Sequence, residues 1–378
     1  MVNQLNQMPG KKNFPEKVFL QPLSIIFGLI TYIRNRLFDY DVIQSHEFEI
    51  PVISVGNINV GGTGKTPHIE YLVSILKNEF SIAVLSRGYK RDTKDFIIAD
   101  TNSTVYEIGD EPRQIKQKFP DIEVAVCEKR VKGIKNLISN FKTLEIILLD
   151  DAYQHRYVKP GISVLLIDYN HPLYKDHLLP YGSLRESHHE IRRANIIIIT
   201  KSPLEIKPIE KRIMIKNVHP FPYQSLYFTA FNYSQPNPVF ENSGFATCFA
   251  TLKNENYTVL LVTGIANPAP LVSFLNKQCI TIIHIAYRDH HKYTIVDLKK
   301  IANKFDAIDS GKKIILTTEK DSVRLNDLPD IQLLFSRPIF YLSVDIQFLN
   351  NEKHLFDNQI IDYVKKNKRH GVLHSAKS

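Results

Sequence analysis

The sequence predicts an α/β protein in which a mostly parallel sheet is flanked by helices and followed by a second, smaller α/β domain. Short runs rich in Ile and Val alternate with helical patterns along the chain, which is typical of βαβ units. The 378 residues, 43% hydrophobic and 23% charged, are enough for about two domains and do not resemble a disordered chain. A segment rich in proline and aromatic residues, 221–240, separates the two halves.

Residues 1–45 predict a short membrane-associating helix ahead of the first domain. The apolar run 23–33 is shorter than the roughly 20 residues that a membrane span requires. No small-residue cleavage site follows it, as a signal peptide would require. Basic residues flank it on both sides: Lys11, Lys12, Lys17, Arg34 and Arg36. A helix lying at the headgroup boundary, with these charges near anionic lipid, explains both features. A buried core helix and a signal or span are the alternatives.

Residues 46–220 contain the elements of the larger domain. Its predicted strands are the apolar runs 51–55, 82–85, 145–149, 163–167 and 195–200. Residues 68–80 predict a helix, because their apolar side chains recur with helical spacing. Residues 221–240 are predicted to be a connecting ribbon between domains. Residues 241–378 are predicted to form the smaller α/β domain, with strands at 258–263, 280–285 and 313–318.

A glycine-rich stretch, G-N-I-N-V-G-G-T-G-K-T-P at 56–67, joins the first strand to the first helix. This order directs backbone N–H groups and the positive end of the helix toward an anion. The glycines allow the backbone to come close to a phosphate. The stretch differs from the usual P-loop pattern, since Asn59 stands where the first glycine is expected.

The loop nevertheless predicts a nucleotide triphosphate site on a P-loop NTPase-like fold. Lys65 is expected to reach the β- and γ-phosphates, and the Thr66 hydroxyl to join the shell of a Mg²⁺ ion. The nucleotide-binding residues are then Gly61, Gly62, Thr63, Gly64, Lys65 and Thr66. Asp150 and Asp151 end another predicted strand, where carboxylates hold the metal in such sites. Two solvated aspartates capping a helix are the alternative.

The formal net charge of +9 favours an anionic partner such as a phosphate ligand or an acidic membrane surface. No recognised nucleic-acid-binding module is present, so no nucleic-acid partner is expected. The three cysteines, Cys127, Cys248 and Cys279, form no C-x-x-C motif. They therefore indicate neither a disulfide framework nor a zinc site, and they suit a reducing cytoplasm.

Several motifs, in order, resemble those of the tetraacyldisaccharide 4'-kinase family, the lipid A kinases of Gram-negative bacteria. The family's loop is G-N-x-x-x-G-G-x-G-K-T-P, so Asn59 belongs to its pattern. The further motifs are S-R-G-Y (86–89), G-D-E-P (109–112), D-D-x-[FY]-Q-H (150–155), L-R-E (184–186), D-H-x-x-[FY] (289–293) and T-E-K-D (318–321). The likeness extends from about residue 22 to about residue 345. This chain departs from it at Ala152-Tyr153, where Gly-Phe is common, and at 181–183, where Ala-Gly-Pro is common.

The resemblance implies an ATP- and Mg²⁺-dependent kinase that phosphorylates the 4'-hydroxyl of an acylated glucosamine disaccharide 1-phosphate. It implies Asp110 as general base, paired with His290, and Lys65 as a further catalytic residue. Arg185 would offset phosphate charge as an internal arginine finger does, with a surface ion pair between Arg185 and Glu186 as the alternative. From the residues alone, Asp110 would be a turn residue and His290 a surface or domain-contact histidine. Glu186 would be a magnesium-side carboxylate, with Asp150 or Asp151 as its partner.

The acceptor would lie among five residues at positions matched to the family: Arg87, Tyr89, Arg130, Gln154 and His155. Residues 317–321 would contact the nucleotide or hold the domains together. A lipid-bound acceptor implies a peripheral or monotopic monomer at the cytoplasmic face of the inner membrane. The alternative function is a P-loop NTPase acting as a switch or metallochaperone.

Overall fold

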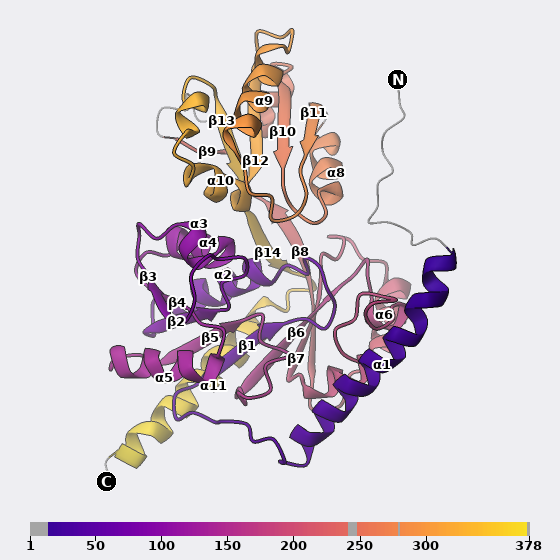
Figure 1. The fold of residues 1–378 in the computed structure, drawn as a ribbon, viewed down its shortest axis with the longest axis vertical. Helices are drawn as coiled ribbons and strands as arrows, with labels where there is room; N and C mark the ends of the chain where they lie inside the picture. The colour runs from indigo at the N-terminus through magenta and orange to yellow at the C-terminus, as the bar shows by residue number, and fades with distance from the viewer. Residues whose placement is uncertain (1–13, 241–247, 279, 376–378) are drawn as a thin grey trace.

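The computed structural model describes residues 14–240, 248–278 and 280–375, which form two sheets with helices packed on them (Figure 1). Lys11 and Lys12 of the predicted interfacial segment lie outside the described residues. The larger sheet has nine strands and the smaller has five. The predicted α/β class with a large, mostly parallel sheet is confirmed.

Every pair of neighbours from β8 to β4 in the larger sheet is parallel, and only the two edge strands, β14 and β3, run antiparallel. The strands lie in the order β14 (Val344–Phe348), β8 (Ser225–Tyr233), β7 (Ile196–Thr200), β6 (Ile162–Asp168), β1 (Val52–Gly56), β5 (Ile146–Asp150), β2 (Ile82–Ser86), β4 (Glu123–Val126) and β3 (Ile97–Ala99). The parallel strands are continuous apolar runs because helices cover both faces.

Alternate strand residues face two helical layers. One face packs against α2 (Lys65–Leu76), α4 (Asp110–Lys118) and α11 (Lys353–Ser375), and the other against α5 (Arg130–Asn140) and α6 (Pro208–Val218). Loops of this part contain the shorter elements α3 (Val105–Ile108), η1 (Leu173–Lys175) and η2 (His188–Arg193). The five strands predicted for this half agree with the structure to within one residue at most ends.

The helix predicted at 68–80 begins and ends earlier than the pattern suggested. It starts at Lys65 because Gly64, with φ of 89°, provides the left-handed residue before it. Pro67 falls in the first turn, where its missing N–H costs nothing. Phe80 lies beyond the helix but is still buried in the same core.

The smaller sheet is parallel except for its last strand. Its order is β11 (Thr281–Ala286), β10 (Thr258–Thr263), β12 (Lys313–Thr318), β13 (Ile339–Leu342) and β9 (Asn237–Pro238). One face packs against α7 (Phe249–Asn254) and α8 (Ala269–Lys277). The other packs against α9 (Ile295–Asp306), α10 (Glu319–Asn326) and η3 (Ile331–Leu334).

The chain passes between the sheets twice, through β8 and back through β14 (Figure 1). The predicted ribbon, 221–240, therefore contains the long strand β8 of the larger sheet. Residues 344–375, which the sequence places in the second domain, lie on the first sheet instead. The reason is that Phe348, Phe356 and Ile360 fill the core beside α2. The other predicted domain boundaries remain predictions.

The N-terminal helix α1 (Phe14–Asp39) runs along the outside of the larger half (Figure 1). It is fixed by Ser24, whose Oγ donates to the Leu178 carbonyl at 2.8 Å, and by the buried Phe38. Much of its remaining apolar surface is exposed: Leu23, Ile25, Ile26, Leu29, Ile30, Tyr32, Ile33 and Leu37. Among the described residues, no helix has the length and apolar character needed to cross a membrane.

Candidate active site

A cleft of about 380 Å³ lies where the two sheets meet. The larger half lines it with the glycine-rich loop and with Asp151, Arg185 and Lys201. The smaller half contributes residues 265–267, His290 and residues 318–320. The carboxyl ends of β1, β5 and β7 all point to this cleft, which is where open α/β sheets bind their ligands.

The glycine-rich loop is held from behind by side chains that bind its carbonyl oxygens. Thr200 Oγ1 donates to the Thr63 oxygen at 2.9 Å, and Lys201 donates to the Gly62 oxygen. A side chain at Gly64 would be strained, because φ there is 89° and a Cβ would lie 2.7 Å from the Phe231 ring. Because these side chains hydrogen-bond its carbonyl oxygens, the loop can direct its N–H groups toward a phosphate.

His68, in the first turn of α2, also stabilises this loop. Its Nδ1 is 2.7 Å from the Gly64 oxygen, and its Nε2 is 3.2 Å from Thr229 Oγ1. Burial lowers the pKa of His68 to about 4, so the ring is neutral at physiological pH. A neutral ring with Nδ1–H as donor to Gly64 and Nε2 as acceptor from Thr229 satisfies both contacts.

Lys65 extends along the cleft from the first turn of α2. Its Nζ lies 3.3 Å from Asn57 Oδ1 and 3.5 Å from Asp151 Oδ1. Arg185 Nη1 lies 3.3 Å from Asp151 Oδ2, so Asp151 sits between two cations. Asp151 adopts a left-handed backbone conformation, with φ of 47°, directly after β5. A triphosphate entering the loop would meet both cations together with this carboxylate.

The structure distinguishes the two adjacent aspartates. Asp151 lines the cleft, whereas Asp150 is 1% exposed and accepts a hydrogen bond from Ser86 Oγ at 3.1 Å. Its other oxygen, Oδ1, is buried without a partner. Burial, together with the charges of Glu111 and Asp151, raises the pKa of Asp150 to about 7. The three carboxylates Glu111, Asp150 and Asp151 therefore lie close enough to repel one another.

The residues present suit a magnesium ion held largely by nucleotide phosphates. Among the described residues, no group of three or more His, Cys, Asp or Glu could hold a metal by itself. Mg²⁺ in kinase sites typically uses one or two carboxylates plus substrate phosphates. Asp151 and Thr66 line the cleft, and the unpaired oxygen of Asp150 lies behind them. The donor set therefore fits such an ion.

Asp110 and His290, 180 positions apart, meet beside the cleft, which His290 lines. His290 Nδ1 lies 2.8 Å from Asp110 Oδ2, and Arg324 donates to the same oxygen through Nη2 at 2.5 Å and Nε at 2.9 Å. Burial alone would raise the pKa of Asp110. The hydrogen bonds from His290 and Arg324 outweigh it and hold that pKa well below the usual range. The carboxylate is therefore ionised at neutral pH.

Arg324 belongs to none of the sequence motifs, although it follows the T-E-K-D motif by three residues. Asp321 binds Arg324 Nη1 at 2.8 Å and also accepts from the Gly264 N–H at 2.8 Å. Residues 317–321 thus support the arginine that reaches Asp110. Glu111, which lines the cleft and binds Lys320 at 3.2 Å, was missed as well. Its place beside Asp110 in G-D-E-P was the available signal.

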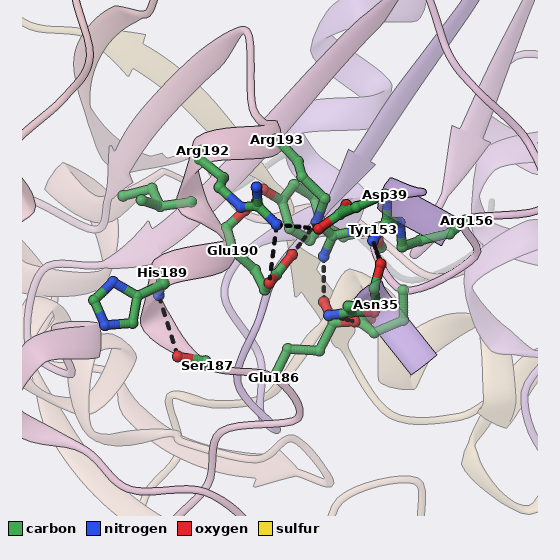
Figure 2. A network of polar contacts seen from close by, with 12 residues as sticks. Asn35, Asp39, Tyr153, Arg156, Glu186, Ser187, His189, Glu190, Arg192 and Arg193 are labelled. Carbon is green, nitrogen blue, oxygen red and sulfur yellow. Dashed lines mark hydrogen bonds and ion pairs between the residues drawn. The ribbon is translucent and has the colours of Figure 1, made fainter. Parts of the chain in front are cut away.

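Glu186 is surrounded by basic and amide side chains, and it does not line the cleft. Its Oε1 accepts from Arg34 at 2.5 Å and from Asn35 at 3.3 Å, and Arg193 binds its Oε2. Figure 2 shows Glu186 with Asn35 and Arg193 turned toward it. The side chain is 1% exposed. These contacts do not support the magnesium role predicted for Glu186, because both of its oxygens are already bound.

Four of the five predicted acceptor residues fall into two groups. Tyr89 and Arg87 are exposed, and Tyr89 contacts His290 edge to face, with ring centroids 5.1 Å apart. Arg130 is buried and donates to the main-chain oxygens of Cys127 and Asp150, and Gln154 donates to that of Asn57. Arg130 and Gln154 therefore brace the site from within.

His155 is half-buried beside the charges of both arginines of this set. Burial, with Arg130 and Arg87 nearby, lowers the pKa of His155 to about 4. The imidazole is therefore neutral at physiological pH. It can offer one donor and one acceptor to a polar ligand next to the exposed guanidinium of Arg87.

Comparison with known proteins gives consistent matches along nearly the whole chain. A family model described as LpxK, tetraacyldisaccharide-1-P 4'-kinase, matches residues 16–365. A tetraacyldisaccharide 4'-kinase of Phocaeicola vulgatus is 45% identical over 353 residues, covering 93% of this chain and 96% of that protein. One of Bacteroides thetaiotaomicron is 43% identical over 359 residues, covering 93% and 94%.

A solved structure has the same fold. It is described as the "apo" form of LpxK from Aquifex aeolicus in complex with ATP, and it is 27% identical to this chain. The TM-score is 0.70, and the match covers 92% of this chain and 99% of that one. The overall fold is therefore shared with a protein crystallised with a nucleotide.

Proposed function

We propose that this protein, which belongs to the tetraacyldisaccharide-1-P 4'-kinase family, transfers the γ-phosphoryl group of ATP to the 4'-hydroxyl of an acylated glucosamine disaccharide 1-phosphate. This reaction is a step of lipid A biosynthesis. The observation that most supports it is the shared cleft, in which a phosphate-binding loop from one sheet faces an Asp–His pair completed by the other.

The chain's own residues suit an in-line transfer. The loop residues Gly61–Thr66 and Lys65 would hold the triphosphate, and Arg185 would offset charge that develops on the transferred group. The acceptor oxygen attacks the γ-phosphorus, the bond to the β-phosphate oxygen breaks, and ADP leaves. The hydroxyl proton passes to Asp110. Because the pKa of Asp110 is low, it accepts this proton late, which suits a loose transition state that requires little deprotonation.

Thr66 and Asp151 would hold Mg²⁺, with Asp150 behind them. When bound, the ion would supply positive charge that neutralises the phosphate oxygens. The acceptor would lie beside Tyr89 and Arg87, with His155 as a directional hydrogen-bonding group. An arginine fork is well matched to a sugar phosphate.

The exposed apolar face of α1 would bring the cleft to a membrane surface. At least five large apolar side chains on this helix are more than half exposed, which is costly in water and favourable at a lipid interface. An acylated acceptor stays in the bilayer, so the enzyme would work as a peripheral or monotopic protein at the cytoplasmic face of the inner membrane. We propose that it does so as a monomer.

A direct transfer assay tests this function. The purified full-length protein is incubated with ATP, Mg²⁺ and the tetraacylated disaccharide 1-phosphate in detergent, and the product is located by mass spectrometry and phosphorus NMR. We expect one new phosphate on the 4' position, and none with Lys65→Ala. ATP hydrolysis without any phosphorylated lipid would instead favour the NTPase switch.

A further inference from the structure

We propose that Arg324 is a positioning residue for this transfer: it fixes one oxygen of the Asp110 carboxylate and leaves the other for the acceptor hydroxyl. The proposal rests on the proposed kinase function and adds a residue to its mechanism. It comes from the geometry of three hydrogen-bonded groups that belong to both halves of the molecule.

The guanidinium of Arg324 is fixed by the smaller half. The side chain is 4% exposed, and its Nη1 donates to Asp321 Oδ1 and to the Gly264 oxygen, each at 2.8 Å. Asp321 is itself fully buried and accepts from Thr318 Oγ1 at 2.7 Å. Gly264 leaves the necessary room, because a Cβ there would lie 2.9 Å from Asp321 Oδ1. The ends of β10 and β12 thus aim the arginine.

The other edge of the same guanidinium reaches across to the larger half. Nε and Nη2 both donate to Asp110 Oδ2, at 2.9 and 2.5 Å, and His290 Nδ1 lies 2.8 Å from that same atom. Among the described residues, no group donates a hydrogen bond to Oδ1 of Asp110 or forms an ion pair with it. One oxygen is therefore saturated with donors, and the other is the one that can accept a substrate proton.

The alternative is that Arg324 only joins the two halves. A second arginine–aspartate pair between the two halves allows the two roles to be distinguished. Arg113 on α4 also pairs with an aspartate of the smaller half, Asp327 at 3.5 Å, but it does not contact Asp110. Both arginine–aspartate pairs cross between the same two regions. Only the Arg324 pair holds the residue that takes the proton.

The two roles of Arg324, positioning Asp110 and joining the halves, predict different pH dependences of the transfer reaction. The charged and titratable groups facing Asp110 are His290, Arg324 and Lys320. Burial favours the neutral carboxyl, and the donors counteract it. Removing Arg324 therefore raises the pKa of Asp110, so the protonated, inactive form persists to higher pH. Removing Arg113 leaves these interactions unchanged.

The test compares R324Q, R324K and R113Q with the wild-type full-length enzyme in the transfer assay, from about pH 5 to pH 9. We expect R324Q to lower kcat on the order of 10²-fold at neutral pH, with an acid limb that rises into this pH range from below it, and with little change in KM for ATP. R324K keeps the charge but not the two-pronged geometry, so it should recover part of the rate. R113Q should keep the wild-type acid limb.

The proposal is overturned if R324Q has the wild-type acid limb and loses no more activity than R113Q. If R324Q does not fold, as judged by its thermal unfolding, the pH profile of R324K decides by the same criterion. A wild-type protein that leaves the glycolipid unphosphorylated would contradict the proposed function itself, an outcome that is distinct from a failure of the Arg324 assignment.

Discussion

Asp110 and Glu186 are both bound by arginines, yet their surroundings are opposite in kind. Asp110 is 16% exposed, and its contacts with His290 and Arg324 all go to one oxygen. Glu186 is 1% exposed, and donors from Arg34, Asn35 and Arg193 occupy both of its oxygens. A carboxylate with a free oxygen at a cleft can exchange a proton with a ligand, whereas one saturated inside the protein can only hold structure together.

The position of Glu186 still matters to the cleft, because its neighbour Arg185 lies in it. Arg185 contacts Asp151, while Glu186 faces α1, as expected for adjacent residues in an extended segment. The backbone N–H of Arg185 also donates to the Ile58 oxygen at 2.7 Å. The N-terminal helix and the phosphate-binding half are therefore joined at the residue next to the proposed arginine finger.

The largest effect is expected from Asp110→Asn. The amide keeps the shape of the side chain but cannot take a proton, so kcat should fall by about 10²–10⁴-fold. ATP binding, measured by calorimetry with a non-hydrolysable analogue, should change little because Asp110 is not part of the glycine-rich loop proposed to bind the triphosphate. Asp92→Asn, which alters an exposed pair with Lys292, is the control and should be fully active. Equal activity in both variants would remove Asp110 as the base.

Glu186→Gln should affect stability more than chemistry. It leaves Arg34 and Arg193 without their anionic partner, which should cost about 2–4 kcal/mol in urea unfolding, less than a fully buried pair because Arg34 is 39% exposed. Glu47→Gln breaks an exposed pair with Lys159 and should cost about 0–1 kcal/mol. A fully stable Glu186→Gln enzyme with an altered Mg²⁺ dependence would restore the metal role that the sequence resemblance implied.

These two carboxylates also show how far the sequence could predict the site. The loop 56–67 was predicted from local order alone, because a strand, a glycine cluster and a helix are contiguous. The Asp110–His290 pair was implied only by the family resemblance, since contiguity says nothing about residues 180 positions apart. Its geometry in the structure agrees with that implication. Arg324 was missed for the same reason: its partner lies in the other half.

The fold was predictable where strands are buried on both faces. The apolar runs that form β6 and β7 are typical of strands in a parallel sheet covered on both faces. The edge strand β14 was missed, although its residues alternate between apolar and polar. Five alternating residues do not reveal which sheet they join, and this strand pairs with β8, more than 100 positions earlier. Sequence order placed it in the wrong half.

The two faces of α1 also differ, since one packs on the protein and the other is exposed and apolar. Asn35 and Phe38 face the protein, whereas Ile25 and Leu29 are exposed at 67% and 58%. We expect the double variant Ile25→Glu/Leu29→Glu to bind anionic vesicles at least tenfold more weakly, since each lost apolar insertion is worth about 1–2 kcal/mol. Turnover with detergent-dispersed acceptor should persist. Unchanged sedimentation with vesicles would show that another surface mediates binding.

Glu319 is a third acidic residue, intermediate between the other two, and it gives the smallest predicted effect. It lies at the edge of the cleft on α10, and the groups that face it are Glu70, Lys118 and Asp345. Lys118 lies 3.6 Å from Glu319 but only 2.8 Å from Glu70, so one lysine serves two carboxylates. Burial, followed by repulsion from Glu70, raises the pKa of Glu319 to about 7.

A carboxyl group whose pKa is higher in the folded than in the unfolded state adds stability below its unfolded pKa and loses that contribution as pH rises through the folded value. Wild-type stability should therefore fall, on account of Glu319, between about pH 4.5 and pH 7. Glu319→Gln removes this loss, and it should be about 1 kcal/mol more stable than wild type at pH 8 while gaining little at pH 5. Urea unfolding at the two pH values measures the difference. Glu255→Gln, which alters an exposed pair with Lys312, is the control. If Glu319→Gln changed the free energy of unfolding equally at both pH values, Glu319 would already carry its charge at pH 5.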